Sequence, residues 1–500
     1  MLEARANGRA DGRRARLVST YFDTPDHELA RRGLALRVRE RSGRYVQTVK
    51  SGECPDGMAG GIANGTALAR GEWEDPIGGP SPDPHAPESG RLLPAEAVDR
   101  LAPLFRTEIV RRTIWLKPTR ATRIEAAIDQ GMILAPGQDA GEAITEIEFE
   151  LKRGDVAALY DAALEVLAVA PVRIEQRSKS ARGYRLVGPE PAAVKAVHAA
   201  AVDLDRGLTG HQALQRIVRA CLDQMQQNEA AVLAGLPEGI HQMRVALRRL
   251  RAILAAFGPM LPKRQRRCLT AELRRLGEAL GTARNLDVFL GELVGPARKA
   301  IGDIAGMRPF VAAAEARREA AYARAAETIG STGYTGIVLR LLRWCDGCGW
   351  RADPDSQLGA PIGDIAAEIL DRQLKAARRR GADFESQSPA ERHKFRIAVK
   401  KLRYAAEVLG GLYGAAAAGL FLKPVKRLQD ELGAVNDLRV GREIVAELAE
   451  ADHGSGGIAD AGAAVLDWHA YRHAKWTAQL PRQVDRLLDS EPFWACRPQA

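Results

Sequence analysis

At 500 residues the chain is too long for one hydrophobic core, and its 46% hydrophobic and 27% charged side chains are ordinary for a folded protein. The net charge is +10. Residues 201–500 carry nearly all of this excess, since they contain 44 basic and 35 acidic side chains, whereas residues 1–200 contain 29 and 28. This distribution favours a polyanionic partner for the second part. No stretch approaches the about 20 apolar residues of a membrane-spanning helix, which excludes a membrane anchor, and six mostly isolated cysteines indicate a reducing, cytoplasmic location.

The first part of the chain is predicted to consist mainly of short β-strands. Apolar and basic residues alternate over 34–39, residues 45–50 are rich in β-formers, and glutamates alternate with apolar residues over 145–152. An apolar stripe at helical spacing predicts one helix over 155–168. The sequence Gly188-Pro189-Glu190-Pro191 then interrupts the pattern and predicts a domain boundary.

The second part is predicted to be helical and to contain an internal repeat. The segment that begins His241-Gln-Met-Arg matches the segment that begins His393-Lys-Phe-Arg, at an offset of 152 residues. The same offset relates Leu280-Gly281 to Leu432-Gly433, which indicates two copies of one helical unit with pseudo-two-fold symmetry. We therefore expect a β-rich domain over 1–190, a short helical linker over 191–206, and a helical domain over 207–500 with repeats at about 207–355 and 356–500.

Each repeat predicts a helix with one cationic face. Positions i, i+3, i+7 and i+10 share a face of an α-helix. They are occupied by His241, Arg244, Arg248 and Arg251 in the first repeat and by His393, Arg396, Lys400 and Arg403 in the second. If the symmetry brings the two faces together, they repel each other unless a chain of phosphates neutralises them. The alternative is a solvated face paired with neighbouring acids, but neither copy has an acid among its face positions.

The helical part carries a motif that occurs once in each repeat. The pattern H-x-x-R-[VI]-x-x-[RK]-[RK]-L-R is followed by L-G-x-x-R-N-L-D in the first copy and by L-G-x-x-N-D-L in the second. In these motifs residues 207–500 resemble the CHAD family of all-helical domains built from two four-helix repeats. The resemblance implies polyphosphate binding by His241, Arg244, Arg248, Arg249, Arg251, His393, Arg396, Lys400, Lys401 and Arg403, with a supporting role for Arg284, Asn285, Asn436 and Asp437.

Charged side chains of both signs are predicted to share faces of the strands in the first domain. Arg37, Arg39 and Lys50 supply cations, and the strand over 145–152 supplies glutamates. In a sheet that closes on itself such positions line a charged lumen, where carboxylates can hold a divalent metal and cations can hold phosphates. The alternative is a half-exposed sheet with solvated charges.

Residues 15–188 also carry the motifs of a known family. These motifs are Tyr21-Phe-Asp-Thr-Pro25, Gly33-Leu-Ala-Leu-Arg-Val-Arg39, Arg70-Gly-Glu-Trp-Glu74, Thr145-Glu-Ile-Glu-Phe-Glu150 and Ser178-Lys-Ser-Ala-Arg-Gly183. In them the chain resembles the CYTH family of triphosphate tunnel enzymes, which implies an α+β domain with an eight-stranded antiparallel barrel. A CYTH domain followed by a CHAD domain implies an inorganic triphosphatase that depends on Mg²⁺ or Mn²⁺.

The CYTH resemblance also implies roles for individual residues. Phosphate would be held by Arg37, Arg39, Lys50, Arg70, Arg106, Arg112, Lys179 and Arg182. The catalytic residues would be Glu125, Asp129, Glu146, Glu148 and Glu150, of which Glu146, Glu148 and Glu150 are the expected metal ligands. Counting along the chain does not decide whether Arg111 or Arg112 points into the tunnel.

One departure from the CYTH pattern concerns the first strand. The family usually opens with a strand that reads E-x-E-x-K and supplies metal-binding glutamates, but none of the 20 residues before Tyr21 shows this motif. Either the chain begins late and the natural enzyme is active, or the barrel lacks one strand and part of its metal site. In the second case one edge of the sheet stays unpaired.

Two hypotheses of function follow, and a third is disfavoured. In the first, the tunnel domain hydrolyses inorganic tripolyphosphate and the helical domain recruits longer polyphosphate. In the second, the chain is a polyphosphate-binding protein, associated with polyphosphate granules, whose tunnel domain is catalytically impaired. Nucleic acid is disfavoured because few aromatic, Asn or Gln side chains lie near the cationic helices to contact bases.

Overall fold

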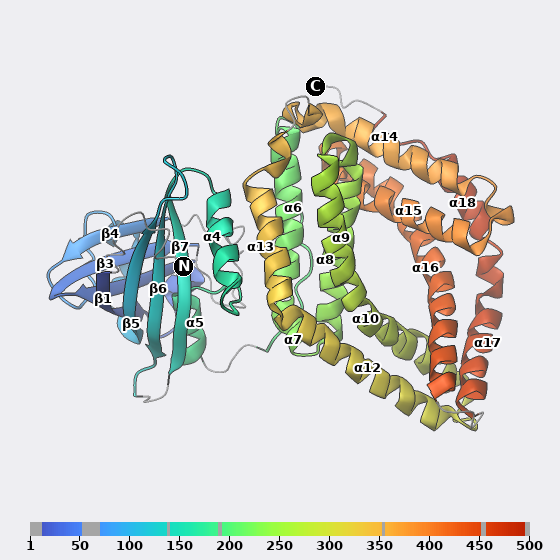
Figure 1. Cartoon of the computed structure of the whole chain (residues 1–500), viewed down its shortest axis with the longest axis horizontal. Helices are drawn as coiled ribbons and strands as arrows, with labels where there is room; N and C mark the ends of the chain where they lie inside the picture. Colours follow the sequence, from blue (N-terminus) through green and yellow to red (C-terminus); the bar gives the residue numbers. More distant parts are fainter. Residues whose placement is uncertain are drawn as a thin grey trace. The chain divides into compact units, whose positions relative to one another are not determined.

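The computed structural model describes residues 13–52, 71–137, 141–188, 193–352, 356–451 and 457–495. The chain divides into two compact units, Met1–Val194 and Lys195–Ala500 (Figure 1). The first contains a β-sheet with a few helices, and the second is helical. No helix among the described residues is long and apolar enough to cross a membrane.

The first unit is built on one antiparallel sheet. Its seven strands are β1 (Arg13–Asp23), β2 (Leu34–Arg41), β3 (Arg44–Ser51), β4 (Glu72–Ile77), β5 (Ala102–Leu116), β6 (Arg123–Leu134) and β7 (Glu142–Arg153). They lie in the order β4-β3-β2-β1-β5-β6-β7, so β4 and β7 form the two edges. This confirms the expected antiparallel tunnel-like sheet; among the described residues it has seven strands and does not close into the eight-stranded barrel that the CYTH resemblance implies.

The two faces of the sheet differ in character, because successive side chains along a strand point to opposite faces. On the outer face, Leu36, Val38 and Val49 pack in one apolar cluster that also includes residues of helices α2 (Glu28–Arg31) and α3 (Ala95–Val98). Helix α4 (Ala157–Leu167) covers the other end of this face and confirms the predicted helix over 155–168. The inner face carries most of the charged residues that the sequence singled out, together with helix α5 (Lys179–Val187), which contacts β5 and β6.

Residues 193–205, at the beginning of the second unit, are not helical. The expected linker helix is absent over the described residues 193–205. Asn228 binds the backbone of Val197 on both sides: the Val197 N–H donates to Asn228 Oδ1 over 3.0 Å, and Asn228 Nδ2 donates to the Val197 carbonyl over 2.8 Å. The polar backbone groups of Val197 thus pair with a side chain instead of with a helical turn.

The second unit consists of α-helices of two repeats (Figure 1). The first repeat contains α6 (Gly210–Gln227), α7 (Glu229–Leu233), α8 (Pro237–Ala256), α9 (Lys263–Ala279), α10 (Gly281–Val288), α11 (Gly295–Ile301), α12 (Met307–Gly330) and α13 (Thr332–Asp346). The second contains α14 (Ile362–Gly381), α15 (Pro389–Leu409), α16 (Ala415–Ala451), α17 (Gly457–Thr477) and α18 (Leu480–Leu488). The π-helical turn Phe289–Val294 continues α10.

Two backbone hydrogen bonds show the pseudo-two-fold symmetry directly. The Gly210 N–H donates to the Ala360 carbonyl over 2.9 Å, and the Ile362 N–H donates to the Leu208 carbonyl over 2.7 Å. Gly210 and Ile362 are 152 residues apart, and so are Leu208 and Ala360, so each bond is the symmetry mate of the other. The equivalent helices α8 and α15 pack against each other. The symmetry therefore brings together the two helices that carry the cationic faces.

Candidate functional site

The cationic end of the inner face lies on strands β2 to β4. Arg37 Nη2 lies 3.1 Å from Glu72 and 3.4 Å from Glu74, and Lys50 Nζ lies 3.1 Å from Glu72. Arg39 donates from Nε to Ser19 Oγ over 3.2 Å. Burial, followed by the charge of Arg37, lowers the pKa of Arg39 to about 10. The predicted phosphate-binding residue Arg70 lies outside the described residues.

Three carboxylates meet at the other end of this face. The strand register places Asp129 opposite Glu146 and Ala127 opposite Glu148, so all three acids point to the same side of β6 and β7. One oxygen from each of them lies within 4.8 Å of the others. We call Asp129, Glu146 and Glu148 the acidic cluster.

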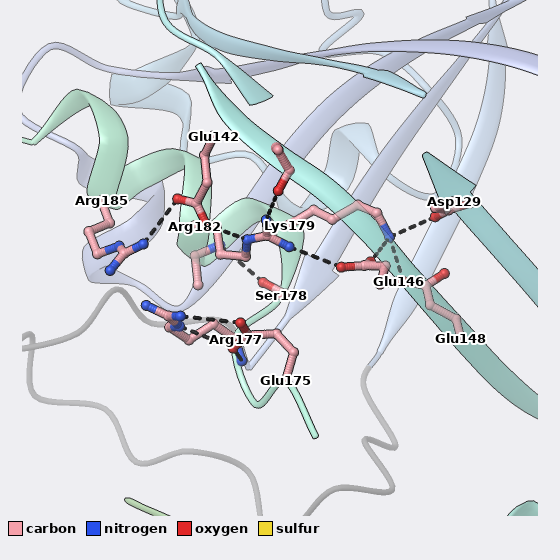
Figure 2. A network of polar contacts seen from close by, with 12 residues as sticks. Asp129, Glu142, Glu146, Glu148, Glu175, Arg177, Ser178, Lys179, Arg182 and Arg185 are labelled. Carbon is pink, nitrogen blue, oxygen red and sulfur yellow. Dashed lines mark hydrogen bonds and ion pairs between the residues drawn. The ribbon is translucent and has the colours of Figure 1, made fainter. Parts of the chain in front are cut away.

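Three cations contact the acidic cluster, and Figure 2 shows two of them, Lys179 and Arg182. Lys179 Nζ contacts all three acids, at 2.9 Å from Asp129 and 2.7 Å from Glu148, and also pairs with Glu146. Arg111 donates from Nε and Nη2 to the two oxygens of the fully buried Asp129 over 2.8 and 2.7 Å, and from Nη2 to Glu148 over 2.6 Å. Arg182 donates from Nη1 to Glu146 over 3.0 Å. The site therefore holds both signs of charge in direct contact.

The charges of the site fix its protonation. Burial alone would raise the pKa of Glu148, but the charges of Lys179 and Arg111 outweigh it and lower that pKa to about 2. Burial acts against the charged form of Lys179, yet its acidic neighbours raise the Lys179 pKa above its ordinary value. At neutral pH Glu148 is therefore ionised and Lys179 is protonated.

Helix α5 positions Lys179 and Arg182. Ser178 caps its first turn by accepting a hydrogen bond from the Ala181 N–H. Gly183 allows α5 to lie on the Phe105 ring, because a Cβ at residue 183 would come within 2.0 Å of that ring. Tyr184 donates from its hydroxyl to the buried Asp23 over 2.9 Å. Asp23 also accepts the N–H groups of Leu29 and Ala30, so it joins β1, α2 and α5.

The structure places several expected site residues away from the acidic cluster. The register of β5 puts Arg111 opposite Asp129, so Arg106 and Arg112 point to the other face of the sheet. This differs from the expectation that Arg106 and Arg112 both bind phosphate in the tunnel. Of the two neighbouring arginines, Arg111 is the one that points to the inner face. Glu125 and Glu150 face inward but pair with Lys152, so Asp129 takes the place expected for Glu150.

The donor set of the acidic cluster fits a hard divalent cation. Its three carboxylates supply oxygen ligands, which Mg²⁺ and Mn²⁺ prefer. Lys179 and Arg111 now neutralise these carboxylates, so a metal ion would compete with the Lys179 contacts. The residues that would hold it are Asp129, Glu146 and Glu148.

A second charged site lies where α8 meets α15. We call Arg244, Arg248, Arg396 and Lys400 the axial cations, because the helices that carry them are related by the pseudo-two-fold axis. The Nε atoms of Arg244, Arg248 and Arg396 are buried without a hydrogen-bond partner in the described part of the chain. Arg244 does donate from Nη1 to the Gly277 carbonyl over 2.6 Å.

The axial cations destabilise one another's charged forms. Burial, followed by the charges of Arg396 and Arg248, lowers the pKa of Lys400 to about 7. Burial and Arg248 lower the pKa of Arg244 to about 10. The pKa values of His241 and His393 are also lowered, first by burial and then by Arg284 and Arg396 respectively. On the opposite faces of the two helices, Leu250 and Leu402 are buried.

The remaining residues of the cationic helices have varied surroundings. Arg403 lies 3.5 Å from Glu407, and Arg249 lies near the buried Cys221 thiol, whose pKa burial raises to about 11. Arg284 of the second motif lies 3.6 Å from Glu292. In the second repeat Asn436 donates to Asp437 over 3.4 Å. Arg251 and Lys401 belong to a neighbouring group of cations described below.

The two units match two known domain families. Residues 7–184 match the CYTH domain and residues 216–446 match the CHAD domain. The chain therefore carries a CYTH domain followed by a CHAD domain, as the motifs predicted.

Individual relatives agree with this assignment. An inorganic triphosphatase from Haemophilus influenzae is 34% identical over 172 residues, which are 34% of this chain and 46% of that protein. The chain thus matches about half the length of that relative. The crystal structure of the CHAD domain from the plant Ricinus communis superposes with a TM-score of 0.52 at 29% identity, over 59% of this chain and 98% of the plant domain.

Proposed function

We propose that the CYTH domain hydrolyses a phosphoanhydride bond of inorganic tripolyphosphate. The observation that carries this proposal is the acidic cluster in contact with Arg111, Lys179 and Arg182, on the same face as Arg37, Arg39 and Lys50. A substrate with several phosphates needs cations along its length, and the reacting phosphate needs a metal site at one point. The likeness to an inorganic triphosphatase over 172 residues supports the same activity.

In this proposal the protein's own residues bind and orient the substrate. Arg37, Arg39 and Lys50 hold phosphate oxygens through charge-assisted hydrogen bonds. Arg111 and Lys179 keep Glu148 ionised, since their charges lower its pKa to about 2. Asp129, Glu146 and Glu148 would hold a Mg²⁺ or Mn²⁺ ion, which would supply charge neutralisation for phosphate oxygens and a more acidic water molecule.

The test is phosphate release from tripolyphosphate with Mg²⁺ or Mn²⁺. We expect Glu148→Ala to lower kcat on the order of 10²-fold, because it removes a ligand and a partner of both Arg111 and Lys179. Glu108→Ala is the matched control, since Glu108 lies on the opposite face of the sheet, where it pairs with Arg16 and Arg106. Equal rates for the two variants, or no turnover by the wild-type chain, would contradict the proposal.

We also propose that the CHAD domain binds polyphosphate between α8 and α15. The carrying observation is the set of axial cations: the buried Nε atoms of its three arginines have no hydrogen-bond partner among the described residues, and the charges of the set repel one another. A chain of phosphates would supply the missing acceptors and the missing negative charge at once. This proposal holds whether or not the CYTH domain is active, so it also supports the hypothesis of a polyphosphate-binding protein without catalysis.

Polyphosphate affinity should depend on pH through Lys400. Its pKa of about 7 in the free protein should rise when phosphates neutralise Arg248 and Arg396, so binding should take up a proton. Affinity should therefore fall as pH rises above 7, by up to about tenfold per pH unit. Both histidines titrate below this range, since their pKa values are lowered. Calorimetry in two buffers of different ionisation enthalpy measures the proton uptake.

The matched control for this prediction is Lys400→Arg. Arginine stays charged throughout the range, so the variant should bind with little pH dependence and without proton uptake. Identical pH profiles for this variant and the wild type would show that Lys400 does not titrate on binding.

A further inference from the structure

A second group of cations lies beside the axial cations. Lys401 of α15 is close to Arg380 of α14, Arg251 of α8 and Arg266 of α9: after burial, the charges of these three arginines lower its pKa. In the described part of the chain no carboxylate forms an ion pair with any of the four. We call Arg251, Arg266, Arg380 and Lys401 the side group.

The side group is continuous with the axial cations. The charge of Arg251 contributes to lowering the pKa of both Arg244 and Lys401, so Arg251 lies near both of them. Arg244, Arg248 and Arg251 also line one cleft between α8 and α9, with a volume of about 270 Å³, whose α9 side is formed by Arg274, Gly277 and Glu278. An extended polyanion bound at the axis would therefore meet the side group next.

The pseudo-symmetry does not reproduce the side group on the other side of the axis. At the offset of 152 residues, Arg251 corresponds to Arg403 and Lys401 to Arg249, which are still cations. Arg266, however, corresponds to Ala418, and Arg380 to Asn228. Arg403 also lies 3.5 Å from Glu407, whose counterpart beside Arg251 is Ala255. At these four positions one side thus has four cations and the other has two, of which Arg403 pairs with Glu407.

The position of Arg266 depends on a glycine. A Cβ at residue 258 would come within 2.2 Å of Arg266 Nη1, so Gly258 leaves the space that the guanidinium fills. The equivalent glycine, Gly410, instead faces the Cβ of Ala418, at 2.8 Å from a Cβ built on it. The same backbone feature therefore receives an arginine in one repeat and an alanine in the other.

From this asymmetry we infer that long-chain polyphosphate leaves the axis on one side only, over Arg251, Lys401, Arg266 and Arg380. The inference rests on the proposed binding of polyphosphate by the axial cations. It adds that the bound polyphosphate follows one path across the domain, although the two repeats are nearly symmetric. It also adds that the side group contributes affinity only for chains long enough to reach beyond the axis.

The test compares long-chain polyphosphate with tripolyphosphate on the full chain in EDTA, which prevents hydrolysis. Labelled long-chain polyphosphate gives one Kd, and its displacement by unlabelled tripolyphosphate gives the affinity of the short chain at the same site. We expect the double variant Arg266→Ala with Arg380→Ala to raise the Kd of long-chain polyphosphate by about 10- to 100-fold. Its affinity for tripolyphosphate should stay within about twofold of the wild type. The double variant Arg267→Ala with Arg379→Ala removes the same charge from exposed neighbours and should change neither affinity.

A second variant tests the geometry without changing the charge. Gly258→Ala should displace Arg266 and weaken the binding of long-chain polyphosphate only. Gly330→Ala, whose added Cβ meets no atom within 4 Å, should have no effect.

Equal losses of affinity in both arginine double variants, or no loss in Arg266→Ala with Arg380→Ala, would overturn the inference. If the axial variant Arg248→Ala with Lys400→Ala binds like the wild type, the proposed function fails instead, so the two failures are distinguishable.

Discussion

Replacing Arg248 and Lys400 together by alanine is expected to weaken polyphosphate binding by about 10²- to 10⁴-fold. Each charge-assisted contact contributes about 1.5–3 kcal/mol, and a tenfold change in Kd corresponds to about 1.4 kcal/mol. Both side chains lie where the equivalent helices α8 and α15 meet. The charge of Arg248 lowers the pKa of both Arg396 and Lys400, so these cations destabilise one another's charged forms. Titration of the full chain with polyphosphate at fixed salt measures the loss.

The thermal stability of this double variant separates binding from folding. Removing two mutually repelling cations should leave Tm unchanged or raise it, as is typical of residues retained for binding. The matched control is Lys263→Ala with Arg264→Ala, which removes the same charge from exposed positions of α9. Equal losses of affinity in the two double variants would show that binding follows net charge and not the axial cations.

Replacing Asp129 by alanine is expected to destabilise the first unit by about 3–5 kcal/mol. Asp129 is fully buried, and it accepts two hydrogen bonds from Arg111 and pairs with Lys179. Its removal takes the one fully buried carboxylate away from Arg111 and Lys179, whose side chains are themselves mostly buried, and this costs far more than the loss of an exposed ion pair. Because the chain has two units, the measurement must report on the first unit alone. Hydrogen exchange of the β6 and β7 amides does so.

The control for Asp129→Ala is Glu150→Ala. Glu150 lies on the same inner face but is largely exposed and pairs with Lys152, so its removal should change the stability by no more than about 0.5 kcal/mol. A similar loss of protection in both variants would contradict the structural role of Asp129.

Periodicity predicted that the glutamates share a face, and the CYTH resemblance implied their role together with Asp129. The alternation of glutamates over 145–152 placed Glu146 and Glu148 on one face, and the structure brings them together with Asp129. The same alternation could not separate Glu150 from its neighbours. Residues two apart on a strand are about 6.6 Å apart, so only the register with β6 decides which acids meet.

The role of Arg111 could not be predicted because an arginine follows it directly. Successive side chains of β5 point to opposite faces of the sheet, so one of these two neighbouring arginines faces inward whichever way the strand is oriented. The register with β6, which places Asp129 opposite Arg111, decides between them. The lack of a linker helix has a similar origin, since Asn228 binds Val197 from 31 residues away in the sequence.

In the helical domain the offset of 152 residues carried most of the information. It predicted two equivalent cationic helices, and the paired hydrogen bonds of Gly210 and Ile362 show the symmetry that relates them. The offset predicted nothing about Arg266, because that residue has no charged counterpart. Its contribution depends on the space beside Gly258, which only packing reveals.

The crystal structure of the chain with bound long-chain polyphosphate is the most direct measurement. It should show phosphate density between Arg248 on α8 and Lys400 on α15, within hydrogen-bond distance of both side chains. Density confined to exposed residues such as Lys263 and Arg264, with nothing between α8 and α15, would contradict the central claim that the duplicated helices form one phosphate-binding site.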